Sequence, residues 1–213
     1  VGALLLRCAP WMTDCECWGP VSVAAWRQSG LGYCSGPCPQ RRQGRQAWMR
    51  FEGQTLTRFT LDLRQAVQAI RGPQVKTARS LFALPILEPQ SEAWFAQNLD
   101  DFLAAYDWTV PMAMPLMESV PIDASQAWLT RLVQAVARHP GALKKTIFEL
   151  QARDWNRRQQ NAIPDQQLAD WMRLLRLNGG QNYGYYPDDF INNPPDNSRI
   201  RPHFSSWRYP DHD

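Results

Sequence analysis

The stretch TIFELQARDWNRRQQNAIPDQQLADWMRLLRLNGGQNYGYY, residues 146–186, decides the fold of this 213-residue chain. Its first seven residues are apolar and partly β-branched, which predicts a strand. Asp165 is a favoured N-cap residue, and it precedes apolar residues at helical spacing: Leu168, Trp171, Met172 and Leu175. Gly179 and Gly180 end this helix, and residues 181–186 predict a second strand. A strand, a helix and a strand in this order predict two parallel strands joined by a crossover helix.

The same alternation extends toward the N-terminus. A helix is predicted over 47–71, where one stripe of a surface helix is formed by Phe59, Leu63, Val67 and Ile70. Gly72 and Pro73 stop it before a strand at 75–84. Further segments follow in the same rhythm: a helix capped by Ser91, a strand at 108–114, and a helix opened by Asp123 that stops at 139–141.

This order of elements predicts an α/β fold with parallel strands, for which two architectures are open. One is an open doubly wound sheet, and the other is part of a (β/α)₈ barrel. No Gly-x-Gly-x-x-Gly follows any predicted strand, which removes the main reason to favour a dinucleotide-binding sheet. Four strands are half of the usual eight, so we expect the C-terminal half of a TIM-like barrel.

Composition divides the chain into three parts. Residues 1–46 form a leader that contains all five cysteines, 47–190 form the half barrel, and 191–213 form an irregular tail. The pairs Cys15/Cys17 and Cys34/Cys38 could suggest zinc, but their spacings miss the usual two-residue separation. An altered or truncated start of a longer protein is the simpler interpretation, and we expect no metal and no cofactor.

Charge and hydropathy exclude several classes of protein. A net charge of +3 without a basic stripe argues against nucleic acid as a partner. The apolar run at residues 3–6 is far shorter than the roughly 20 residues that a membrane span needs. Arg7 and Cys8 interrupt this run, so it has no recognisable signal-peptide layout.

Ligands of parallel α/β folds bind beyond the carboxyl ends of the strands. The predicted strand ends are rich in aromatic residues and carboxylates: Met114, Glu118, Glu149, Gln151, Trp155, Tyr183, Tyr185, Tyr186, Asp188 and Asp189. Aromatic rings stack on sugar rings, and carboxylates accept hydroxyl hydrogen bonds and attract amino-sugar cations. These residues predict a saccharide site, whereas Trp128 and Trp171 lie on apolar helix stripes and predict core packing. Glu149 is read equally well as an ion-paired structural acid.

Several long segments resemble the C-terminal domain of PgaB-type poly-β-1,6-N-acetyl-D-glucosamine (PNAG) N-deacetylases. They are GPQVKTAR (72–79), SEAWFAQNLDDF (91–102), ELQA (149–152) with Trp155, and NYGYYPD (182–188); the ending with Arg201, Phe204 and Trp207 is similar too. The resemblance implies a barrel-shaped, glycoside-hydrolase-like domain that binds and cleaves partially deacetylated PNAG during biofilm polysaccharide export. It implies that Glu149 and Asp188 are catalytic candidates and that the polymer is bound by Trp94, Met114, Glu118, Trp155, Tyr183, Tyr185, Tyr186 and Asp189.

The same resemblance implies a periplasmic or outer-membrane location and an outer-membrane export porin as a partner. The family carries a Phe-His-Asp-Asp-type motif at an early strand end, whereas this chain has Arg7-Cys8-Ala9-Pro10 there. Glycosidic hydrolysis normally needs two carboxyl groups. We therefore expect cleavage to be lost or very weak while polymer contacts survive. Three alternatives are an active glycosidase with another acid pair, a structural or interaction module, and a degenerate gene product without activity.

Overall fold

The computed structural model describes residues 6–7, 16–17, 39–155, 162–189, 191, 194–196 and 198–200. Most of the predicted leader and tail lie outside these residues, as do Cys15, Cys34 and Cys38 of the zinc alternative. Two short strands are described in the leader, β1 (Leu6–Arg7) and β2 (Glu16–Cys17), and they pair antiparallel. Among the described residues, no helix combines the length and the apolar character that crossing a membrane requires.

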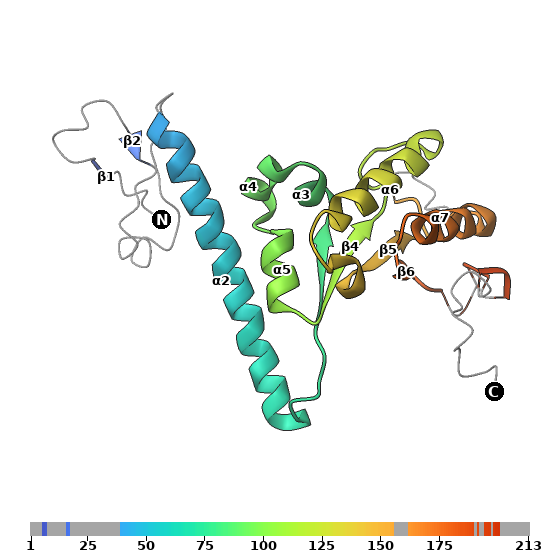
Figure 1. Cartoon of the computed structure of the whole chain (residues 1–213), viewed down its shortest axis with the longest axis horizontal. Coiled ribbons are helices and arrows are strands. Elements are labelled where there is room, and N and C mark those ends of the chain that lie inside the picture. The colour runs from blue at the N-terminus through green and yellow to red at the C-terminus, as the bar shows by residue number, and fades with distance from the viewer. Residues whose placement is uncertain are drawn as a thin grey trace.

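Four parallel strands alternate with helices, which confirms the predicted α/β class (Figure 1). The elements of the body run in the order α2 (Pro39–Arg71), β3 (Ala78–Phe82), α3 (Ala83–Leu87), η1 (Pro89–Ser91), α4 (Glu92–Phe95), α5 (Leu99–Ala105), β4 (Trp108–Ala113), α6 (Ile122–Ala137), η2 (Ala142–Lys145), β5 (Ile147–Gln151), α7 (Asp165–Leu177) and β6 (Asn182–Tyr186). The strands lie side by side in the order β3-β4-β5-β6, so each pairs with the next one along the chain.

One face of this sheet is packed against α6 and α7 and carries the hydrophobic core. Buried and half-buried residues alternate along β4, and Phe148 and Leu150 of β5 are buried while Glu149 between them is half-buried. Side chains alternate between the two faces of a strand. The buried set joins the core with residues of α6 and α7, including the predicted core residues Trp128 and Trp171. We call the opposite, half-exposed side of the sheet its inner face.

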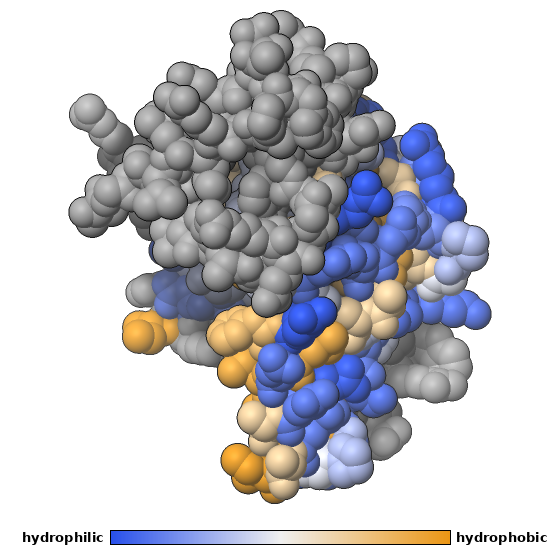
Figure 2. Space-filling view, turned by 90° about the vertical axis from the view of Figure 1, so that its left-hand side faces the viewer, coloured by the Kyte–Doolittle hydropathy of each residue, from blue (hydrophilic) through white to orange (hydrophobic). Residues whose placement is uncertain are grey.

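The long helix α2 lies along the β3 side of the sheet, and its apolar stripe is exposed (Figures 1 and 2). The side chains of Leu56, Phe59, Leu63, Val67 and Ile70 are between 43% and 84% exposed. A stripe at this spacing normally faces a core, so the structure differs here from the usual pattern. The flank of this stripe is bonded to the body: Arg79 donates to the Thr60 hydroxyl at 2.6 Å, and this hydroxyl also bonds to the Tyr106 hydroxyl.

The segment after β3 is wrongly predicted as one helix capped by Ser91. Ala96 has a positive φ of 50°, which ends α4 after four residues. Asn98 then caps α5, because its side-chain oxygen accepts a hydrogen bond from the Asp101 backbone N–H at 3.0 Å. Ser91 is buried, and its hydroxyl has no hydrogen-bond partner among the described residues.

Most other boundaries shift by only a few residues, although α2 begins at Pro39 instead of residue 47, inside the predicted leader. The strand predicted at 75–84 is limited to Ala78–Phe82, and α6 begins at Ile122 with Pro121 at the N-cap instead of Asp123. The helix predicted to start after Asp165 begins with that residue. The predicted glycine stops are confirmed, since Gly72 and Gly179 have φ values of 93° and 92°, a region that glycine adopts without steric cost.

Candidate saccharide site

The inner face of the sheet carries one continuous row of residues across all four strands. The register pairs Phe82 with Met112, Met112 with Glu149, and Glu149 with Gly184. This row lies near the carboxyl ends of the strands, where ligands of parallel α/β folds bind. We call these strand ends and the loops that follow them the rim. Glu149, a predicted catalytic residue, therefore lies on the inner face two residues before the end of β5, next to the rim.

Open space lies beside Glu149 because its neighbour on β6 is a glycine. A Cβ added to Gly184 would meet no atom within 4 Å. The Glu149 side chain is half-buried, and burial raises the pKa of its carboxyl. No ion pair involving Glu149 is present among the described residues. The interpretation of Glu149 as an ion-paired structural acid is therefore not supported by this part of the chain.

Two aromatic rings lie together at the rim above this row. Trp155 follows β5 and Tyr186 ends β6, and their rings are stacked with centroids 6.1 Å apart and an interplanar angle of 29°. The backbone fixes this contact, since the Ala152 N–H donates to the Tyr186 carbonyl at 2.7 Å. Tyr186 remains 56% exposed, so the pair presents an aromatic surface to solvent.

Acidic residues follow β6 directly. Asp188 is exposed, whereas Asp189 is partly buried and pairs with Arg153 at 3.6 Å. The Asp189 carboxylate also accepts a hydrogen bond from the Ile191 backbone N–H at 3.1 Å. Asp189 thus has a structural role within the rim, while the Asp188 side chain is exposed to solvent.

A second half-buried carboxyl group lies in the loop between β4 and α6. Burial raises the pKa of Glu118, and the nearby charge of Glu88 raises it further. Glu88 directly follows α3, the short helix after β3. Sequence reasoning missed this residue. Its only sequence signal is an acidic residue just before Pro89, in a segment that lacks regular periodicity.

The structure does not bring every predicted site residue to the inner face. Tyr183 and Tyr185 are in register with Phe148 and Leu150, and they pack against the hydrophobic core on the helix-covered face. Met114 is 1% exposed, which leaves little of its side chain for a ligand. The Trp94 side chain is 74% exposed and lies on α4, which follows β3. Trp155 follows β5, and β4 lies between these two strands in the sheet.

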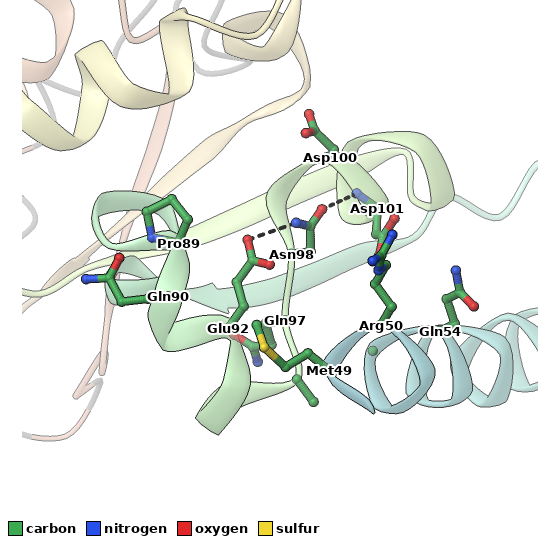
Figure 3. A pocket seen from close by; sticks show the side chains of 12 residues that line it. Met49, Arg50, Gln54, Pro89, Gln90, Glu92, Gln97, Asn98, Asp100 and Asp101 are labelled. Atoms are coloured by element: carbon green, nitrogen blue, oxygen red, sulfur yellow. Dashed lines mark hydrogen bonds between the residues drawn. The ribbon is translucent and has the colours of Figure 1, made fainter. Parts of the chain in front are cut away.

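A cavity of about 800 Å³ lies elsewhere, between α2 and the α4–α5 connection (Figure 3). Its hydrogen bonds are internal to the protein: Asn98 donates to Glu92 at 2.8 Å and accepts from the Asp101 N–H. Burial raises the pKa of Glu92. The cavity contains none of the predicted site residues, so it is separate from the saccharide site. Among the described residues, no group of three or more His, Cys, Asp or Glu side chains could hold a metal ion.

The chain is similar to several known proteins. The family model described as hypothetical glycosyl hydrolase family 13 (GHL13) matches residues 2–186. Poly-beta-1,6-N-acetyl-D-glucosamine N-deacetylases of Escherichia coli K12 and O157:H7 are each 47% identical over 203 residues, which is 95% of this chain and 30% of the relative. The chain thus spans less than a third of these relatives' length.

The fold is also similar to that of a solved structure. The PgaB (BpsB) glycoside hydrolase domain from Bordetella bronchiseptica matches with a TM-score of 0.77 and 39% identity, covering 88% of this chain and 52% of that chain. The resemblance to PgaB-type proteins that the sequence indicates is therefore confirmed. The family model spans most of the chain, including nearly all of the predicted half barrel, and the chain belongs to the GHL13 family, hypothetical glycosyl hydrolase family 13.

Proposed function

We propose that this chain binds partially de-N-acetylated PNAG along the rim of its sheet. The observation that carries the proposal is the position of Glu149, half-buried next to the open space at Gly184 and one row below the stacked Trp155 and Tyr186 rings. The rings supply flat apolar faces for sugar rings. The carboxylates attract the ammonium group that a glucosamine unit carries near neutral pH, and this attraction distinguishes it from an acetylated unit.

The chemical identity of the polymer is supported by the relatives, which are named as N-deacetylases of poly-beta-1,6-N-acetyl-D-glucosamine. Further contacts would come from Trp94, Glu118 and Asp188, which are exposed or half-exposed around the rim. We also propose a periplasmic or outer-membrane location and an export porin as a partner, both on the resemblance alone. Deacetylation is not proposed for this chain.

Weak glycosidic hydrolysis is a second candidate, favoured by the raised pKa of Glu149. A carboxyl group with a raised pKa is suited to protonate the leaving oxygen, and a second carboxylate serves the other step. Asp188 is the exposed acid at the end of the neighbouring strand. Incubation with partially de-N-acetylated polymer and analysis of the product lengths tests this candidate. A folded protein that releases no shorter chains would exclude it.

The binding proposal is tested by calorimetric titration with matched glucosamine oligomers, fully acetylated and partly de-N-acetylated. We expect the de-N-acetylated oligomers to bind more tightly, and Glu149→Gln to remove most of the difference. Asp62→Asn is the control, because Asp62 is an exposed carboxylate on α2, away from the rim. Equal affinity for both oligomers, or no binding to either, would contradict the proposal.

A further inference from the structure

Gln151, the last residue of β5, has a completely buried side chain that makes three hydrogen bonds. Its Oε1 atom accepts from the backbone N–H groups of Leu116 at 2.7 Å and Met117 at 3.3 Å. Its Nε2 atom donates to the backbone carbonyl of Arg153 at 2.9 Å. One amide group therefore satisfies three backbone groups that would otherwise lack these partners.

These partners belong to two different loops of the rim. Leu116 and Met117 lie in the loop between β4 and α6, directly before Glu118. Arg153 lies in the loop after β5, two residues before Trp155. In the register, Gln151 pairs with Tyr186, the residue on which Trp155 stacks. Gln151 thus connects the loop that carries an acid with the loop that carries an aromatic ring.

We propose that Gln151 is a positioning residue that holds the Glu118 loop and the Trp155 loop in the arrangement that binds the glycan. This inference rests on the proposed function, and it adds a residue that need not touch the sugar itself. A buried side chain with three bonds allows little movement of the loops it joins. Loss of the bonds releases both loops, since backbone groups left unpaired in a dry interior move to find water.

The chemistry of the amide makes the proposal testable by conservative replacement. A glutamine offers both an acceptor and a donor, whereas an ionised carboxylate only accepts. Gln151→Glu therefore keeps the two bonds from Leu116 and Met117 but places negative charge against the Arg153 carbonyl. Protonation of the introduced carboxyl restores a donor for that carbonyl. Glycan binding by this variant should therefore recover at low pH relative to the wild type.

The experiment compares the wild type with Gln151→Leu, Gln151→Glu and Ser125→Ala in the full chain. Ser125→Ala is the matched control, because it also breaks a buried hydrogen bond, from the Trp171 indole N–H at 2.9 Å, but within the helix layer. Two readouts are needed: amide hydrogen exchange of the 114–120 segment without ligand, and affinity for de-N-acetylated glucosamine oligomers per folded molecule at several pH values.

We expect Gln151→Leu to speed exchange of the Leu116 and Met117 amides at least tenfold and to weaken binding at least tenfold. Ser125→Ala should leave both unchanged. Unchanged exchange or unchanged affinity in Gln151→Leu would overturn the positioning role, and so would the absence of low-pH recovery in Gln151→Glu. If Gln151→Leu does not fold, the pH dependence of Gln151→Glu decides the test. A wild type that binds no oligomer would refute the proposed function. The hydrogen-exchange data would still show whether Gln151 holds the Glu118 loop in place.

Discussion

Trp155 and Tyr186 stack on each other from the ends of two neighbouring strands, with their ring centroids 6.1 Å apart. The pair joins a residue of the loop after β5 to the last residue of β6. Because the strands are in register, the contact lies at one end of the sheet, beside the row that contains Glu149. An aromatic surface and a half-buried acid are thereby placed in one region of the molecule.

Replacement of the ring at Trp155 should affect binding more than folding. We expect Trp155→Ala to weaken affinity for de-N-acetylated oligomers about tenfold, equal to about 1.4 kcal/mol of lost contact energy. Its side chain is only partly buried, so the free energy of unfolding should change by about 1 kcal/mol or less. Calorimetric titration and urea unfolding measure the two effects, and a large loss of stability with full binding would contradict this assignment.

Tyr185 should behave in the opposite way, because it packs against the hydrophobic core next to Leu150. Tyr185→Ala removes most of a large side chain from that packing. We expect the free energy of unfolding to fall by about 2 kcal/mol, since the residue is only partly buried. Affinity per folded molecule should stay close to the wild type. If Tyr185→Ala instead binds poorly without loss of stability, this residue contacts the glycan.

Glu149 should make the folded state less stable as pH rises. Burial raises the pKa of its carboxyl above the unfolded value near 4.5, so the folded state holds the proton more tightly. The free energy of unfolding therefore falls as pH increases from the unfolded pKa through the higher folded pKa. Glu149→Gln lacks this titration, and its stability relative to the wild type should increase over that range. Urea unfolding across pH 4 to 7 tests the sign.

Asp107 should have the reverse effect at acid pH. Hydrogen bonds from the backbone N–H and hydroxyl of Thr77, at 2.9 and 3.0 Å, lower the pKa of the Asp107 carboxyl to about 2. Its contribution to stability is present above its usual pKa near 3.8 and is lost as pH falls toward 2. Asp107→Asn should therefore lose less stability than the wild type on acidification. Parallel acid-unfolding curves for the two proteins would contradict this.

The exposed stripe of α2 should tolerate polar substitution. Phe59 and Leu63 are 59% and 52% exposed, so the double variant Phe59→Gln, Leu63→Gln should change the free energy of unfolding by about 0.5 kcal/mol or less. It should also reduce the fluorescence of an added apolar dye. Leu132→Ala is the contrasting variant, because Leu132 is fully buried and its truncation should cost about 2–5 kcal/mol.

The regular part of the fold could be predicted because its signals are local. β-branched apolar runs, helical spacing and glycine stops identify β4, α6, β5, α7 and β6, whose positions agree to within a few residues. The break at Ala96 could not be predicted, because alanine rarely adopts a positive φ and tertiary contacts must impose it. The exposure of the α2 stripe is equally invisible in the pattern, since periodicity marks a face without naming its partner.

The candidate site could be predicted in part. Strand ends can be recognised from sequence, which is why Glu149, Trp155 and Asp188 could be identified as candidates. All three lie at or after the carboxyl ends of β5 and β6. The face of the sheet on which each side chain lies is harder to predict, because a shift of one residue along a strand moves a side chain to the other face. The sequence therefore groups Tyr183 and Tyr185 with Tyr186, although both pack against the core.

The order of strands in the sheet is the order of strands in the chain. Each new strand that leaves the ribosome therefore meets an edge already made by the strand before it. This sheet can be assembled progressively during synthesis, without waiting for a distant partner, which favours early and rapid folding of the segment.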